Sequence, residues 1–205
     1  MQQPQPESHA FTVDDYHAMV GSGILREDAR VELIDGEVMD MTPIGRRHAA
    51  VVARLARMLT RRLDETVAVV WPQNPVRMDE HSEPQPDVTI LCAREDDYAD
   101  EEPGPDDVLL IVEVADTTLL YDRNRKVPLY ARAGIAEVWL VDLTGNSITV
   151  HRDPGPQGYR DVTILRGGDV LSPRTVPGLT LIVDEVLHGE HRAQQHRGYQ
   201  YDPNA

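Results

Sequence analysis

One acidic residue inside an apolar run constrains this chain more than any other feature. Residues 109–115 read Leu-Leu-Ile-Val-Glu-Val-Ala, so a strand there carries Glu113 among apolar neighbours. Burying a carboxylate without a partner costs several kcal/mol, so the fold has to satisfy it. Asp87 begins a second strand-like run, 87–91. If the two strands are neighbours, both acids can bind one divalent cation, which satisfies their charge and is itself a catalyst.

The composition predicts one globular domain. The chain has 205 residues, of which 40% are hydrophobic, and this is enough for a single large core. We expect the domain to span residues 11–187, between a disordered N-terminus at 1–10 and a polar tail at 188–205. No apolar run approaches the ~18 residues of a membrane span, and the N-terminus lacks the apolar centre of a signal peptide. The single cysteine, Cys92, permits no internal disulfide, so we predict a cytoplasmic protein without membrane contact.

The net charge argues against general binding of nucleic acids. A formal charge of −15 opposes contact with polyanions, because such binding depends on neutralising phosphates. The charge is unevenly distributed, with many acidic residues in segment 95–107. Six arginines gather in one earlier segment: Arg46, Arg47, Arg54, Arg57, Arg61 and Arg62. A helix bearing them can either meet a phosphate backbone or form an ordinary solvated face.

Local patterns predict alternating helices and strands. Thr12 suits the N-cap of a helix to about residue 20, Asp35-Gly36 suits the turn of a hairpin over 30–41, and apolar spacing predicts a long helix after Pro43. Further expected elements are strands at 67–71, 75–79, 86–91, 108–115, 136–142 and 178–183, a helix from about 121 to 133, and an antiparallel hairpin within 147–165. We therefore expect an α/β fold with a mixed central sheet, flanking helices and a peripheral antiparallel β-hairpin extension.

The helix expected after Tyr121 contains a proline and ends at a glycine. Pro128 means either that the helix begins near Val127, with proline at its first position, or that it is kinked there. Gly134 suits the residue that follows a helix C-terminus.

Four residues form a candidate set for phosphodiester cleavage. Asp87 and Glu113 are separated by a strand, a loop and a strand, so they can lie on adjacent strands and face one cleft. Two carboxylates and a backbone carbonyl suit Mg²⁺. Lys126 follows Glu113 in the chain, and a lysine beside the attacking water stabilises developing negative charge. Glu32, inside the apolar run 31–34, is a third acid.

Each candidate also has a purely structural interpretation. Asp87 can cap a turn, Glu32 can point outward from an edge strand, and Lys126 can be an exposed helix residue. His48, near the start of the arginine-rich helix, and Asp122 are candidate accessory residues. His48 equally suits helix packing, and Asp122 suits an ion pair with Lys126 four residues later.

Several of these segments recur together in a known family. They are 31–38, Thr42-Pro43 with His48, 85–88, 111–114, and a motif in which Asp122, Lys126, Leu129, Tyr130, Gly134, Glu137, Trp139, Val141 and Asp142 keep fixed spacing. In these segments the chain resembles the Uma2 family, a bacterial group of restriction-endonuclease-like proteins. The resemblance covers roughly residues 10–185, and the last motif is the most specific part.

The resemblance implies a nuclease core of the PD-(D/E)xK type with a displaced lysine. The usual lysine position, two residues after the second acid, is occupied by Ala115. The resemblance implies that Asp87 and Glu113 are metal ligands and that Lys126 supplies the charge-stabilising base. It gives Glu32 the role of accessory acid. The chain departs from the family pattern at 116–118 and at Pro128, and the acid at 116 adds negative charge near the metal.

These features predict a Mg²⁺- or Mn²⁺-dependent endonuclease that hydrolyses DNA. We expect a homodimer, because cleavage of both strands favours two sites related by a two-fold axis. In addition, Trp139 and the apolar residues within 147–165 provide more apolar side chains than are needed to cover one face of the sheet. The alternative is a catalytically weak or inert homodimeric interaction or regulatory module that keeps the nuclease fold. The net charge favours the alternative, and the constellation of acids and lysine favours the nuclease.

Overall fold

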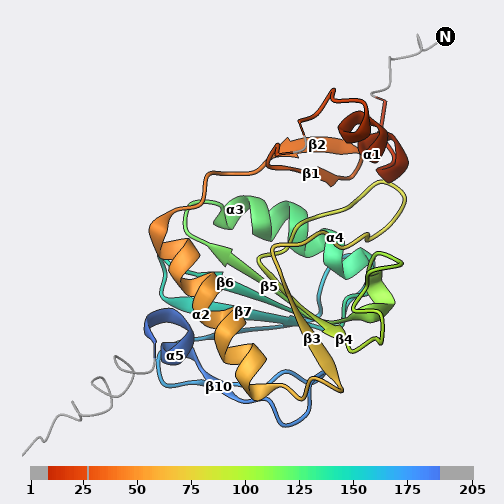
Figure 1. Cartoon of the computed structure of the whole chain (residues 1–205). Helices are drawn as coiled ribbons and strands as arrows, with labels where there is room; N and C mark the ends of the chain where they lie inside the picture. The colour runs from red at the N-terminus through yellow and green to blue at the C-terminus, as the bar shows by residue number, and fades with distance from the viewer. Residues whose placement is uncertain (1–8, 27, 190–205) are drawn as a thin grey trace, which may run out of the picture.

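The computed structural model describes residues 9–26 and 28–189, and its centre is a six-stranded sheet (Figure 1). The strands, in spatial order, are β3 (Ala68–Pro72), β4 (Val88–Cys92), β5 (Val108–Ala115), β6 (Glu137–Asp142), β7 (Ser147–Arg152) and β8 (Asp161–Leu165). Strands β5 and β6 pair in parallel, and the other neighbouring pairs of this sheet are antiparallel. The predicted mixed sheet is therefore present.

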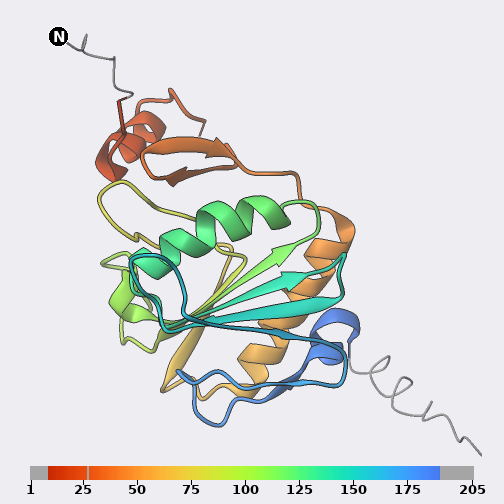
Figure 2. The same ribbon diagram turned by 180° about the vertical axis from the view of Figure 1, so that it is seen from behind.

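A helical crossover joins the two parallel strands. After β5 the chain forms α3 (Leu119–Tyr121), a π-helical turn (Asp122–Lys126) and α4 (Val127–Arg132), and then returns as β6. This helical segment lies along one face of the sheet (Figure 2). Strands β5 and β6 are almost completely buried, as expected for a parallel pair covered on both faces.

The opposite face of the sheet carries the second helical layer. This layer contains α2 (Arg46–Arg62), α5 (Val183–His188) and the short hairpin of β9 (Val170–Leu171) and β10 (Leu181–Ile182). Leu55 of α2 packs with Val112 in one core, whereas Leu129 of α4 packs with Ile111 in the other. Consecutive residues of β5 thus enter different cores, because side chains alternate across a strand.

A small N-terminal unit packs beside the crossover helices. It consists of α1 (Val13–Gly21) and the hairpin of β1 (Val31–Ile34) and β2 (Glu37–Asp40). The predicted cap and turn are confirmed: Thr12 and Asp15 form a capping box, and Asp35 and Gly36 have φ of 51° and 78°. A Cβ at position 36 would lie 2.6 Å from the Cβ of Ala10, so this turn needs glycine for space as well as for its positive φ.

Three sequence predictions need correction. Residues 75–79 form no strand and contribute a single bridge, between Asp79 and Ser82. Trp139 is not surplus apolar surface, because it is fully buried and its indole nitrogen donates to Glu137 at 2.7 Å. The final strand is shorter than predicted, since residue 183 already begins α5.

Other local predictions are resolved by the structure. Pro128 lies in the first turn of α4, but the helix does not begin there, because the π-helical turn Asp122–Lys126 directly precedes α4 and its backbone is already helical. The change in hydrogen-bonding pattern therefore falls next to the proline, which lacks an N–H. Gly134 follows the helix with φ of 82°. The hairpin predicted within 147–165 forms the β7–β8 end of the main sheet.

The predictions for the two ends fall largely outside the described residues. The disordered N-terminus predicted at 1–10 is described only at residues 9 and 10, and the polar tail predicted from 188 onward only at 188 and 189. Among the described residues, no helix is long and apolar enough to cross a membrane.

A buried histidine in β7 gives the fold a testable pH dependence. Burial, with a smaller contribution from Arg123, lowers the pKa of His151 to about 4, and its Nε2 has no hydrogen-bond partner among the described residues. The unfolded chain binds this proton near pH 6.5, so the free energy of unfolding should fall as the pH drops from about 6.5 to about 4. The full loss is about 3 kcal/mol.

The measurement is urea unfolding at several pH values for the wild type and His151→Phe. The variant should lose the part of the pH dependence that His151 contributes. Identical pH profiles for the two proteins would contradict this origin.

Candidate active site

The six candidate residues line a single pocket of about 440 Å³. They are Glu32, His48, Asp87, Glu113, Asp122 and Lys126. The pocket lies where the β1–β2 hairpin, the start of α2, the adjoining ends of β4 and β5, and the crossover helices meet. The structure thus brings together residues that are far apart in the sequence.

Strand register places the first two acids beside each other. Val88 of β4 pairs with Val112 of β5, so Asp87, one residue before β4, lies next to Glu113. The backbone amide of Val114 donates to Asp87 Oδ2 at 2.8 Å, and His48 Nε2 lies 2.9 Å from the same oxygen. The backbone amide and the imidazole therefore fix the orientation of Asp87.

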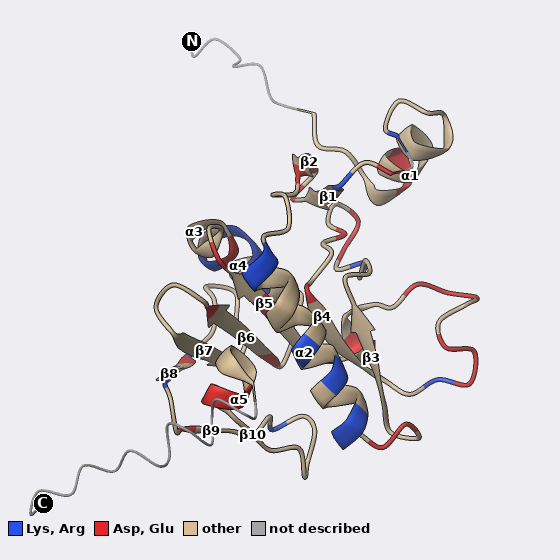
Figure 3. Ribbon diagram, turned by 60° about the vertical axis from the view of Figure 1, so that its left-hand side comes forward, with Lys and Arg blue, Asp and Glu red and all other residues tan. Residues whose placement is uncertain are grey.

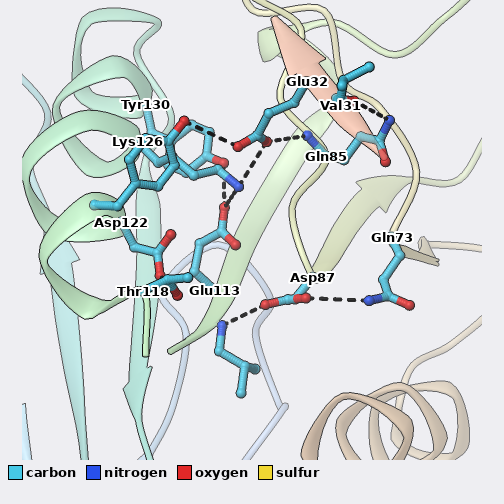
Figure 4. Close-up of polar contacts among 12 residues, drawn as sticks. Val31, Glu32, Gln73, Gln85, Asp87, Glu113, Thr118, Asp122, Lys126 and Tyr130 are labelled. Carbon is cyan, nitrogen blue, oxygen red and sulfur yellow. Dashed lines mark hydrogen bonds and ion pairs between the residues drawn. The ribbon is translucent and has the colours of Figure 1, made fainter. Parts of the chain in front are cut away.

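Lys126 lies between two buried carboxylates. Its Nζ is 2.7 Å from Glu113 Oε1 and 3.2 Å from Glu32 Oε2, and all three side chains are 5% exposed or less (Figure 4). The interpretation of Lys126 as an exposed helix residue is therefore wrong, as is that of Glu32 as an outward-facing strand residue. Lys126 is the last residue of the π-helical turn, a type of irregularity that is frequent at functional sites.

The electrostatics of the pocket follow from this burial. Burial raises the pKa of Glu113 well above its ordinary value, although Lys126 opposes the shift. Burial alone would lower the pKa of Lys126, but the Glu113 and Glu32 carboxylates raise it above its usual value. Burial also raises the pKa of Asp122. One ammonium group therefore lies among three buried acids and pairs directly with two of them, Glu32 and Glu113.

The two accessory candidates have different partners. The hydrogen bond to Asp87 raises the pKa of His48, and the other ring nitrogen, Nδ1, is buried without a partner among the described residues. Asp122 accepts a 2.7 Å hydrogen bond from Thr118 Oγ1. Within the described part of the chain, no direct ion pair joins Asp122 to Lys126, so the predicted pairing four residues apart is not formed.

Sequence reasoning assigned no role to three residues that position the acids. Tyr130 donates a 2.5 Å hydrogen bond from its hydroxyl to Glu113 Oε1. The backbone N–H of Gln85 donates to Glu32 Oε2 at 3.1 Å, and the Tyr121 hydroxyl lies 3.3 Å from Glu32 Oε1. Tyr130 follows Lys126 by four residues, so helical spacing was a usable signal for it.

The remaining oxygen atoms suit a divalent cation. Within the described structure, the hydrogen bonds and ion pairs of Glu113 use only Oε1, so Oε2 is not engaged. In the same part of the chain, Asp87 Oδ1 has a single long contact, 3.5 Å from the side-chain nitrogen Nε2 of Gln73. Hard oxygen ligands of this kind are those that Mg²⁺ prefers.

A mixed sheet with acids on two adjoining strands and a lysine from the crossover defines a nuclease-like α/β fold. The chain belongs to the Uma2 family, whose model, described as "Putative restriction endonuclease", matches residues 13–184.

A solved structure supports the fold. It is a "putative nuclease belonging to DUF820" from Anabaena variabilis, with a TM-score of 0.66 and 12% sequence identity. The alignment covers 86% of this chain and 97% of that chain. No curated protein matches the chain.

Proposed function

We propose that this protein is a divalent-metal-dependent endonuclease that hydrolyses DNA phosphodiester bonds. The observation that carries the proposal is the buried Glu32–Lys126–Glu113 arrangement beside Asp87 in one pocket. Burying a lysine and two acids is costly, and a nuclease site gives this arrangement a use. Membership in a family whose model is described as "Putative restriction endonuclease" supports the same activity.

Asp87 and Glu113 would hold the metal, Mg²⁺ or Mn²⁺, through Asp87 Oδ1 and Glu113 Oε2. When bound, such a cation neutralises phosphate charge and lowers the pKa of water. The Val114 amide and His48 keep Asp87 oriented, and Tyr130 does the same for Glu113. These contacts reduce the reorganisation needed when substrate enters.

Lys126 would stabilise the negative charge that develops during attack on the phosphate. Its ammonium group is held by Glu113 and Glu32, so its position is fixed before the reaction begins. Glu32 acts as the accessory acid that orients Lys126. Lys126 would take the role of the lysine that the usual motif has at position 115, where this chain has Ala115, buried in β5 and too short for that role.

The DNA backbone would approach from the arginine-bearing side of the pocket. Arg30 lines the pocket, and Arg46 and Arg47 are exposed at the adjoining start of α2 (Figure 3). Not every arginine of α2 is available: Arg54 donates to the Val186 carbonyl, and Arg62 pairs with a glutamate of α5. The basic surface is therefore confined to part of the helix, within a chain of net charge −15.

The net charge also favours a second candidate function. A catalytically weak or inert homodimeric interaction module would keep the fold and tolerate a surface that repels DNA. The two functions differ in one respect that can be measured. Only the nuclease requires metal-dependent strand cleavage that is lost when Asp87 is changed.

Metal binding is the first expected property. Mg²⁺ or Mn²⁺ should raise the melting temperature of the wild type, because a ligand that binds only the folded state stabilises it. Asp87→Asn should remove this rise, since it removes a charged ligand. Calorimetry with and without metal makes the comparison. Equal metal-dependent stabilisation in both proteins would show that the metal binds elsewhere.

We also propose that the protein forms a homodimer through the edge of the sheet. Among the described residues, β8 pairs with β7 alone and ends the sheet, and its Val162 and Ile164 side chains are 50% and 56% exposed. An unpaired edge with apolar side chains is a template for pairing with a second copy. Light scattering at micromolar concentration should give twice the 23.0 kDa chain mass, and Ile164→Lys should lower it. A monomer mass for the wild type would contradict the dimer.

A further inference from the structure

A second group of metal-binding side chains lies outside the candidate active-site pocket. It consists of His17 on α1, Glu83 in the segment between β3 and β4, and Glu102 in the acidic loop before β5. Among the described residues, it is the one group of three or more such side chains whose ligand atoms all lie within 4.8 Å of one another. None of the three lines the 440 Å³ pocket.

The spacing of the donor atoms suits a small tetrahedral ion. His17 Nε2 lies 3.0 Å from Glu83 Oε2 and 3.9 Å from Glu102 Oε1. Ligands about 2.0–2.1 Å from a tetrahedral ion are about 3.3 Å from one another, so the two observed distances bracket the required one. Only small side-chain movements are needed to bring the three donor atoms to the distances that one bound ion requires.

The charges of the cluster also favour a cation. Glu83 is 4% exposed, and in the described structure its carboxylate has hydrogen bonds with His17 alone. Glu102 brings a second carboxylate, and the positive groups near the two acids are His17 and Arg77, of which Arg77 forms an ion pair with Asp14. A divalent cation bound here would balance the charge of both carboxylates, including that of the buried Glu83.

We propose that His17, Glu83 and Glu102 bind one Zn²⁺ ion, with water as the fourth ligand. Imidazole nitrogen combined with carboxylate oxygens favours Zn²⁺ over Mg²⁺, which binds mainly oxygen. The three ligands come from separate parts of the chain, so the ion would link α1, the segment between β3 and β4, and the acidic loop before β5. The Glu83 backbone pairs with Leu33 of β1, next to Glu32, so the ion would also stiffen the support of the active-site acids.

The test measures zinc binding by calorimetry in a full-length chain whose active-site metal binding has been removed by Asp87→Asn. This metal-stripped protein should bind one Zn²⁺ with a Kd on the order of 10 µM or tighter, and Mg²⁺ should not compete. Adding Glu102→Gln or His17→Gln should weaken binding at least about tenfold. Both residues are more than 40% exposed, so these substitutions should leave the fold intact.

Glu101→Gln is the matched control, because it removes a neighbouring acid and should leave zinc binding unchanged. The proposal is overturned if the Asp87→Asn protein shows no zinc binding near this affinity, or if Glu102→Gln binds zinc as tightly as its parent. Neither result depends on nuclease activity, so this proposal and the proposed function can fail separately.

Discussion

Lys126→Ala should destabilise the protein by about 3–5 kcal/mol and lower its cleavage rate on the order of 10²-fold or more. The large stability effect follows from burial, because the substitution leaves Glu32 and Glu113 without their shared cation. The rate effect follows from losing the ammonium group that would stabilise the negative charge developing during attack on the phosphate. Denaturant unfolding and a DNA cleavage assay measure the two quantities separately.

The neighbouring Arg125 gives a matched control. Its ion pair with Glu37 is partly exposed, so Arg125→Ala should cost no more than about 1 kcal/mol. Similar stabilities for Lys126→Ala and Arg125→Ala would contradict the buried ion-pair network.

A charge-balanced variant distinguishes the effect of Lys126 on stability from its effect on the cleavage rate. Lys126→Met combined with Glu32→Gln removes one positive and one negative charge, so it should recover much of the lost stability. It should still cleave DNA poorly, because the ammonium group of Lys126 is absent. If this variant cleaves at the wild-type rate, Lys126 has a structural role only.

Asp87→Asn should reduce cleavage on the order of 10²-fold or more while leaving the fold intact. The substitution keeps the shape of the side chain, and an asparagine oxygen can still accept from the Val114 amide. It removes the negative charge that would bind the metal. Cleavage rates with excess Mg²⁺ or Mn²⁺ provide the measurement, and unfolding curves establish that the variant is folded.

A second pocket carboxylate controls for general loss of charge. Asp116 lines the same pocket and is assigned no metal-binding role. Asp116→Asn should therefore cleave at least as fast as the wild type, since it reduces repulsion of the phosphate. If both variants lose activity equally, the effect of Asp87→Asn cannot be assigned to one metal ligand.

The parts of the fold that the sequence predicts well are those with strong local signals. The turn at Asp35-Gly36 requires positive φ, and the apolar spacing of α2 requires one buried face. Glu113 was identified because an acid within a buried strand needs a partner. The sequence shows that Asp87 can lie beside it if the two strands are neighbours, and the pairing of Val88 with Val112 in the structure places it there.

The parts that the sequence does not predict depend on distant contacts. Residues 75–79 have strand-like composition, but the structure gives them no extended partner strand. The π-helical turn has no simple sequence signature, yet it delivers Lys126 to the acids. The hydrogen bond from Tyr130 to Glu113 depends on packing of α4 against β5, and the burial of Glu32 depends on packing of the β1–β2 hairpin against the crossover helices.

The measurement that tests the central claim most directly is cleavage of plasmid and short duplex DNA, with and without Mg²⁺ or Mn²⁺, by the wild type and Asp87→Ala. The account predicts that the wild type cleaves DNA only when metal is present, and that Asp87→Ala does not cleave under the same conditions. A folded wild type that leaves DNA intact with either metal would contradict the account, as would equal cleavage by both proteins.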